Sequence, residues 1–131
     1  MPIYKSTLQL LRLPFSINLL PIFLWALYNS KGQVQLLPCI LSFVIIHFLL
    51  YPASNAYNSF QDKDEGSIAG VENPPPATRQ LYYASLLLDT LVIISSAFVN
   101  LSFLLINLLC IVVSRAYSFR GIRIKKYAIV G

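Results

Sequence analysis

Residues 36–66 read LLPCILSFVIIHFLLYPASNAYNSFQDKDEG, and this stretch decides the fold of the chain. Its first part, from Leu36 to Pro52, is a long apolar run without an acidic or basic residue other than His47. Its second part is polar, and four of the chain's five acidic residues lie between Asp62 and Glu72. This pattern is typical of a helix that crosses a membrane and then enters water.

One face of this predicted helix carries amide and carboxylate oxygens. A helix turns by about 100° per residue, so Asp62 lies about 40° and Glu65 about 20° from Asn58 around its axis. Asn55 lies about 60° away on the same side, and Asp64 about 120° away unless the helix ends first. Such a face suits Mg²⁺, which proteins bind through one or two carboxylates together with substrate phosphates. The alternative is a solvated cap on the helix end. The predicted metal ligands are Asn58, Asp62, Asp64 and Glu65.

Composition places the whole chain in a membrane. Of its 131 residues 56% are hydrophobic and 11% are charged, and the mean hydropathy is +0.66. A soluble domain carries about 25% charged residues. The net charge of +5 is therefore interpreted as membrane topology and not as nucleic-acid binding. Cys39 and Cys110 lie in apolar runs, so we expect two small buried hydrophobic residues, neither a disulfide nor a metal pair.

The sequence predicts an all-α membrane helical bundle that forms a single domain over residues 1–131. Pro14 suits a helix start, Pro21 is expected to kink the first span, and Pro52 the second. The 35 residues between Arg79 and Arg115 would extend ~52 Å as one helix, which is too long for one crossing, so we divide them near Asn100. The four predicted spans are residues 13–30, 33–58, 80–99 and 101–117, with a polar loop at 63–79.

The basic residues predict the orientation. Four spans place the N-terminus, the 63–79 loop and a basic tail, residues 115–126, on one side of the membrane. That side carries nine of the ten Lys and Arg residues, and the other carries only Lys31. The positive-inside rule then puts the acidic stretch and the tail in the cytoplasm. The tail is either a topology anchor or a clamp whose cations bind phosphate oxygens.

Asp89 and His47 are ionisable residues well inside predicted spans. Asp89 is either functional or paired with a neighbour, because a charge inside a membrane span is costly. His47 lies in the middle of its span, where a hydrogen-bonded structural histidine is the main interpretation and a catalytic one the alternative. We find no nucleophile–base pair, phosphate-binding loop or dinucleotide fingerprint in the sequence.

Two motifs resemble a known family. Asn58-x-x-x-Asp62 at the end of a second span, within the string NAYNSFQDKDEGSIAG, resembles the first aspartate-rich motif of the UbiA superfamily of intramembrane prenyltransferases. The tail SRAYSFRGIRIKK, residues 114–126, is similar to the loop after that family's fourth helix. In the right order, the two cover nearly the whole chain.

The resemblance implies a fold of about nine helices, of which this sequence is similar to the N-terminal part. It implies a Mg²⁺-dependent enzyme that transfers a polyprenyl group from a prenyl diphosphate to a small-molecule acceptor, often aromatic, in a bacterial inner membrane. Asn58 and Asp62 would be the catalytic and metal-binding residues. The residues expected to bind the diphosphate are Arg79, Tyr117, Arg123, Lys125 and Lys126.

The sequence departs from the family in two respects. The family's third motif position is Gly66 here, so Asp64 or Glu65 must replace it as a ligand. The family's second aspartate-rich motif, in a later helical half, is absent, so we expect a fragment of the full enzyme whose missing C-terminal half would be a partner. The alternatives are a non-catalytic four-helix membrane protein or inactive remnant, and a small transporter using Asp89 and His47.

Overall fold

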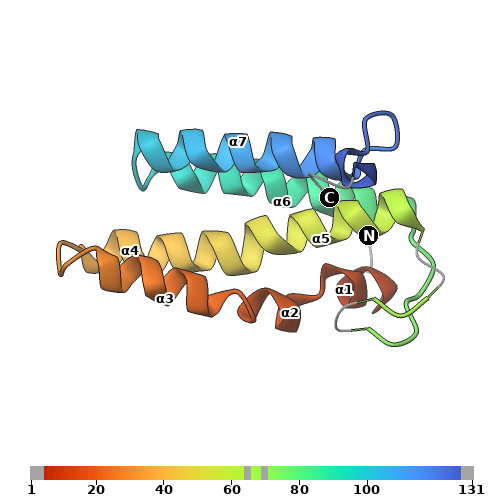
Figure 1. Ribbon diagram of the computed structural model, residues 1–131, viewed down its shortest axis with the longest axis horizontal. Helices are drawn as coiled ribbons and strands as arrows, with labels where there is room; N and C mark the ends of the chain where they lie inside the picture. The colour runs from red at the N-terminus through yellow and green to blue at the C-terminus, as the bar shows by residue number, and fades with distance from the viewer. Residues whose placement is uncertain (1–4, 64–65, 69–70, 128–131) are drawn as a thin grey trace.

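The computed structural model describes residues 5–63, 66–68 and 71–127. Within these residues all the secondary-structure elements are helices, apart from one isolated bridge between Ile68 and Val71. Figure 1 shows the helices lying side by side along one long axis. The α-helices are α1 (Lys5–Leu11), α2 (Leu13–Ile17), α3 (Leu20–Asn29), α4 (Leu36–Val44), α5 (Tyr51–Asp62), α6 (Arg79–Ala97) and α7 (Leu101–Ser118). A π-helix, η1 (Ile45–Leu50), joins α4 to α5, and a short 3₁₀-helix, η2 (Ile124–Lys126), follows α7.

The first span is broken into the three helices α1, α2 and α3. Arg12 separates α1 from α2 with a left-handed φ of 50°. Pro14 lies in the first turn of α2 and Pro21 in the first turn of α3, where the missing N–H of proline costs no hydrogen bond. Pro14 lies at the start of a helix as predicted, but the first apolar helical segment starts earlier than the predicted residue 13, at Lys5. The predicted kink at Pro21 is a break placed just before it.

The second span runs without interruption from Leu36 to Asp62. Its middle turn, Ile45–Leu50, is wound as a π-helix just before Pro52, which occupies the first turn of α5. A proline clashes with the carbonyl four residues earlier, and a wider π turn is one way in which a helix accommodates it. The helix ends at Asp62, because Lys63 has a left-handed φ of 52°. The predicted polar helical face therefore stops at Asp62.

The third and fourth spans form a helical hairpin. The turn between α6 and α7 lies at residues 98–100, where the sequence predicted the division. Asn100 explains the tight restart, since its side-chain oxygen accepts a hydrogen bond of 2.8 Å from the backbone N–H of Phe103. This is an N-cap, which satisfies one of the otherwise unpaired N–H groups of α7.

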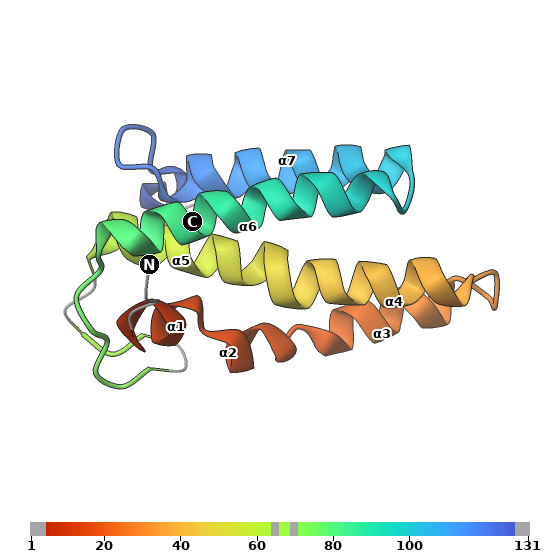
Figure 2. The same ribbon diagram turned by 180° about the vertical axis from the view of Figure 1, so that it is seen from behind.

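We call the two ends of the bundle the loop end, with residues 63–78 and 119–127, and the turn end, with residues 30–35 and 98–100. At the loop end α5 packs on α6, α7 and α1. Figures 1 and 2 show the α3–α4 pair separating from the α6–α7 pair towards the turn end. A cavity of about 560 Å³ lies there, between α3, α4 and Phe103 of α7.

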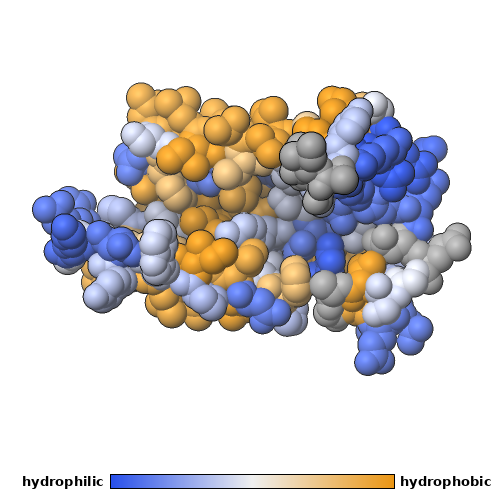
Figure 3. Space-filling model, viewed as in Figure 1, coloured by the Kyte–Doolittle hydropathy of each residue, from blue (hydrophilic) through white to orange (hydrophobic). Residues whose placement is uncertain are grey.

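Little of the chain is buried within itself. One small core joins Leu10, Ala56 and Leu81 at the loop end, and a second joins Ile45, Leu50 and Val92 further along. Most other apolar side chains face outward, and Figure 3 shows them covering the middle of the molecule, with hydrophilic residues at both ends. The outer surface is thus suited to lipid tails.

Four helical segments are long and apolar enough to cross a membrane, which confirms the predicted all-helical, four-span architecture. The expectation for the cysteines was partly wrong. Both are free, but Cys39 is half-buried and Cys110 is exposed on α7. The reason is that α7 buries only Asn107 and Ser118, so most of its side chains face outward.

Candidate functional site

The conspicuous polar site lies at the loop end, where the basic tail folds back over the end of α5. The Lys125 ammonium donates a hydrogen bond of 3.1 Å to Asn58 Oδ1 and also contacts Asp62 Oδ2. Arg123 donates from NH2 to Asp62 Oδ1 at 3.2 Å. Residues more than 60 positions apart in the chain thus meet around one carboxylate. The site joins the predicted acidic motif to two predicted phosphate-binding cations.

Two further contacts fix the tail in this position. Ser118, the last residue of α7, donates from its hydroxyl to Asn58 Oδ1 at 2.8 Å. Arg120 donates from Nε to the backbone carbonyl of Gln61 at 2.6 Å. The left-handed φ of 44° at Arg123 then turns the chain into η2, which carries Lys125.

Among the described residues, the ion pairs at Asp62 carry more positive than negative charge. The Asp62 side chain is 14% exposed and is paired with two cations, so their net charge is +1. Partial burial strengthens these pairs relative to ion pairs in open water. Because an ammonium can only donate, the Asn58 atom that it contacts is the oxygen, and the Asn58 Nδ2 group points elsewhere.

The remaining predicted site residues that the structure describes have fewer or no contacts with Asn58, Asp62 and Lys125. Tyr117 lies nearby, with its ring centroid 5.9 Å from Lys125 Nζ. Arg79 at the start of α6 and Lys126 in η2 are exposed, and no hydrogen bond or ion pair among the described residues joins them to Asn58 or Asp62. The other two predicted metal ligands, Asp64 and Glu65, lie outside the described residues.

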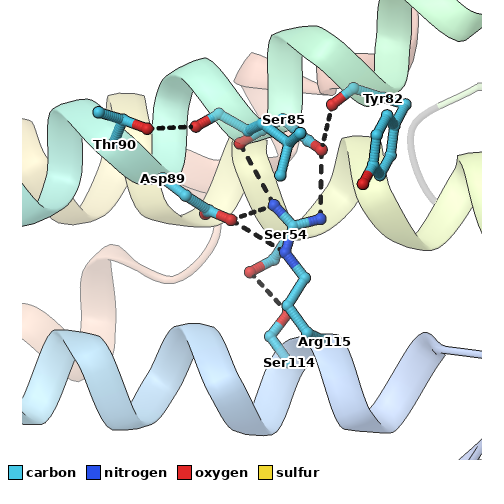
Figure 4. Close-up of polar contacts among 8 residues, drawn as sticks. Ser54, Tyr82, Ser85, Asp89, Thr90, Ser114 and Arg115 are labelled. Atoms are coloured by element: carbon cyan, nitrogen blue, oxygen red, sulfur yellow. Dashed lines mark hydrogen bonds and ion pairs between the residues drawn. The ribbon is translucent and has the colours of Figure 1, made fainter.

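Asp89 forms a buried ion pair with Arg115. Figure 4 shows Arg115 reaching from α7 to α6, where its Nε donates to Asp89 Oδ2 at 2.9 Å and NH2 contacts the same oxygen. Arg115 also donates to the hydroxyl of Ser85 at 3.2 Å and to its carbonyl at 3.3 Å. The guanidinium carbon lies 3.9 Å from the ring centroid of Tyr57 on α5. The structure therefore supports the paired interpretation of Asp89.

A second set of polar contacts joins α5 to α7, which run in the same direction. Ser114 donates to Ser54 at 2.9 Å, and one turn further Ser118 donates to Asn58. Sequence analysis did not single out these serines. The sequence pattern that could have indicated these contacts is a spacing of four residues in both helices. It places Ser54 and Asn58 one turn apart on the same face of α5, and Ser114 and Ser118 one turn apart on the same face of α7.

A polar pocket of about 240 Å³ lies beside this contact, between the junction of α1 and α2, α5 and α7. Its lining combines one arginine with amides, hydroxyls and one aromatic ring. We call it the polar pocket: Arg12, Ser54, Asn55, Asn58, Ser114, Tyr117 and Ser118. Sequence analysis counted Arg12 only as a topology charge, because nothing local in the sequence shows that it is 9% exposed in a pocket.

An apolar groove of about 640 Å³ adjoins the polar pocket and runs between η1, α5 and α7. The two share Ser54, Ser114 and Tyr117 as lining residues. Leu50, Phe103 and Val113 are among the apolar residues that line it. A hydrophilic cavity thus lies beside a hydrophobic one, with Ser54, Ser114 and Tyr117 lining both.

His47 matches the structural interpretation. It is 1% exposed, and Nδ1 donates to the carbonyl of Phe43 at 3.0 Å. Its ring packs against the rings of Phe23, Phe43 and Tyr51. With His47 packed among aromatic rings and Asp89 paired, the two residues of the transporter alternative both have structural roles.

The fit of Mg²⁺ to this site depends on substrate oxygens. No group of three or more His, Cys, Asp or Glu side chains that could hold a metal ion occurs among the described residues. Asp62 supplies one carboxylate and Asn58 one amide oxygen at the same end of α5. Since Mg²⁺ keeps several waters and binds through one or two carboxylates plus phosphates, the pair fits Mg²⁺ carried by a diphosphate.

Comparison with protein-family models, curated proteins and solved structures found no match for this chain. The class of protein is therefore described from the fold alone. It is an all-helical protein with four segments apolar enough to cross a membrane, consistent with a multi-pass membrane protein.

Proposed function

We propose that the protein is a UbiA-like prenyltransferase that uses Mg²⁺ and a prenyl diphosphate as donor of the prenyl group. One observation carries the proposal. The cations Arg123 and Lys125 converge on the Asn58–Asp62 face, in the arrangement expected of a diphosphate clamp opposite a metal ligand. The apolar groove that adjoins the polar pocket gives the prenyl chain a place to lie.

The residues would act through binding and charge. Asp62 and the Asn58 oxygen would hold Mg²⁺, which would supply positive charge for the leaving diphosphate. Arg123 would exchange its bond with Asp62 for bonds with phosphate oxygens, and Lys125 would do the same with its bonds to Asn58 and Asp62. The bond between the allylic carbon and the diphosphate oxygen breaks, the diphosphate leaves with the electron pair, and an electron-rich acceptor carbon bonds to the allylic carbon and releases a proton to water.

The same proposal includes an orientation. In the four-span topology nine of the ten basic residues fall on the side of the 63–79 loop and the tail, so the positive-inside rule places the loop end in the cytoplasm. We assign the protein to a bacterial inner membrane on the strength of the family resemblance, with the donor arriving from the cytoplasmic side.

The test is binding of a non-hydrolysable farnesyl diphosphate analogue to the purified protein in lipid nanodiscs, with and without Mg²⁺. We expect Mg²⁺ to raise affinity by about tenfold or more, because it adds charge-assisted contacts. Asp62→Asn should remove this gain. Glu72→Gln is the matched control, since it changes an exposed carboxylate outside the site. A Mg²⁺ effect that persists in Asp62→Asn would contradict the proposal.

A second candidate is a non-catalytic four-helix membrane protein, in which the ion pairs of Asp62 serve only to hold the tail in place. The Asp62 carboxylate already accepts from two cations, as a purely structural ion-pair cluster would. In that case Asp62→Asn lowers thermal stability, and Mg²⁺ has no effect on binding of the analogue to either variant.

A further inference from the structure

The ammonium of Lys125 occupies the place that a metal ion would take at the end of α5. Its Nζ donates to Asn58 Oδ1 at 3.1 Å and also contacts Asp62 Oδ2, so one cation is held by both oxygens. These oxygens belong to the two residues that the proposed function assigns to Mg²⁺, which binds its ligands at about 2.0–2.1 Å. A metal ion on the same two oxygens would lie against the ammonium, where two positive charges repel strongly. Lys125 and a metal ion therefore exclude each other.

The acceptor atoms of the site are filled by other donors as well. An amide oxygen has two lone pairs, and those of Asn58 Oδ1 receive the Ser118 hydroxyl at 2.8 Å and the Lys125 ammonium. Asp62 Oδ1 accepts from Arg123 at 3.2 Å, so each oxygen of the carboxylate is paired with a cation. A metal ion can bind Asn58 only after one donor has left it. Lys125 is the donor whose departure also removes a positive charge.

The backbone of the tail allows Lys125 to leave. Arg123 has a left-handed φ of 44°, which a residue with a side chain adopts rarely and only when its surroundings hold it there. The bond from Arg123 to Asp62, and those of Lys125 two residues later, hold this turn against α5. When a competing anion takes these bonds, the constraint on Arg123 is lost and η2 is free to move away from α5.

We propose that the basic tail controls the access of metal ions to Asp62. In the absence of a diphosphate, Arg123 and Lys125 keep divalent cations off the Asn58–Asp62 face. A diphosphate draws both cations onto its own oxygens, because these form strong charge-assisted bonds, and thereby frees the face for a metal ion. The inference rests on the proposed function for the choice of a diphosphate. Binding is then ordered: the metal ion follows or accompanies the diphosphate and does not precede it.

The first experiment measures binding of Mn²⁺ alone, without any diphosphate, to the full chain in phosphatidylcholine nanodiscs. Mn²⁺ favours the same oxygen ligands as Mg²⁺, and the electron paramagnetic resonance signal of the free ion reports how much is bound. We expect Lys125→Gln to raise the affinity for Mn²⁺ by about tenfold or more over the wild type, because it removes the charge that fills the site.

Lys63→Gln is the matched control for this experiment. It removes the same charge from the exposed residue that follows Asp62, and Lys63 has no bond to Asn58 or Asp62 in the part of the chain that the structure describes. Because water and salt screen an exposed charge, the affinity for Mn²⁺ should change by less than about threefold. A gain as large as that of Lys125→Gln would mean that charge alone, and not occupation of the site, excludes the metal, and would overturn the inference.

Two further variants locate the effect. The gain should disappear in the double variant Lys125→Gln, Asp62→Asn, because the freed carboxylate is the metal ligand. Arg123→Gln should raise the affinity for Mn²⁺ by about threefold or more, which keeps the test decisive if Lys125→Gln fails to fold. A purely structural ion pair would lower stability in these variants without raising the affinity. Equal affinity in the wild type, Lys125→Gln and Arg123→Gln would overturn the inference, as would a gain that persists without Asp62.

The second experiment measures whether the anion moves the tail. Nitroxide labels would be attached at Tyr83→Cys on α6 and Tyr127→Cys after η2, which are both exposed positions. The native Cys39 and Cys110 would be replaced by serine. The non-hydrolysable farnesyl diphosphate analogue, added in EDTA, should shift the distance between the labels, whereas farnesol should not because it carries no phosphate. An unchanged distance with the analogue bound would overturn the inference.

The outcomes also separate this inference from the proposed function. Equal Mn²⁺ affinity in the wild type and Lys125→Gln, with the Mg²⁺ gain of the analogue intact, overturns the inference and leaves the proposed function standing. A Mn²⁺ gain in Lys125→Gln and a shift of the tail in EDTA, without any Mg²⁺ gain for the analogue, support the inference and overturn the proposed function. Failure of the analogue to bind, with and without Mg²⁺, overturns both.

Discussion

Asp89 and Arg115 provide the sharpest test of the packing between α6 and α7. Their side chains are 12% and 19% exposed, and Arg115 is also bonded to Ser85 and stacked on Tyr57. Replacing Asp89 by Asn keeps the shape of the side chain and removes its charge. The guanidinium then lies in a membrane-spanning bundle without its counter-charge.

The size of the effect follows from the contacts that remain. Removing one partner of a buried ion pair costs about 3–5 kcal/mol, because the other charge is left uncompensated. Arg115 keeps its bonds to Ser85 and its contact with Tyr57, which offset about 1–2 kcal/mol of this cost. We therefore expect Asp89→Asn to lower the free energy of unfolding by about 1–4 kcal/mol.

The assay is reversible unfolding in mixed micelles with increasing sodium dodecyl sulfate, followed by circular dichroism. Thr90→Val is the matched control, since Thr90 is exposed next to Asp89 and bonds only the Leu86 carbonyl, so its loss should cost less than about 0.5 kcal/mol. The double variant Asp89→Leu, Arg115→Met should recover most of the stability, because an apolar pair replaces the ion pair. A loss below about 0.5 kcal/mol in Asp89→Asn would refute the reasoning.

Two further predictions concern helix ends and helix contacts. Asn100→Ala removes the N-cap of α7 and should lower the free energy of unfolding by about 1 kcal/mol in the same assay, whereas Asn100→Asp should keep the cap; equal losses in both would contradict the role of this side chain. Ser114→Ala removes one contact between α5 and α7 and should cost about 0.5–1.5 kcal/mol, with exposed Ser102→Ala as the control; an unchanged stability in Ser114→Ala would show that the contact is not formed.

The number of long apolar helices could be predicted because it depends on local properties. Hydropathy and the rise of a helix predicted four segments long and apolar enough to cross a membrane, and the division near Asn100 followed from length alone. Pro14 marked a helix start for the same local reason. The π turn before Pro52 and the left-handed Arg12 were not predicted, because several backbone conformations accommodate a proline or an arginine equally well.

The site was predicted only in part, because its contacts are long-range. Spacing placed Asn58 and Asp62 on one helix face, and positive charge marked the tail, but no pattern specifies that Lys125 reaches Asp62. The pairing of Arg115 with Asp89 depends on the register of α7 against α6, which hydrophobic periodicity leaves open. The polar pocket depends on three helices meeting, so its arginine could not be assigned from sequence.

The most direct test of the account is whether the basic tail lies on the end of α5. A short thiol-reactive crosslinker would be applied in nanodiscs to Asp62→Cys combined with Lys125→Cys, in a background with the native Cys39 and Cys110 replaced by serine. The structure predicts efficient intramolecular crosslinking, because these two side chains are in contact. Pairing Lys31→Cys with Lys125→Cys, at opposite ends of the bundle, should give none. Absence of crosslinking between positions 62 and 125 in folded protein would contradict the site on which the proposed function depends.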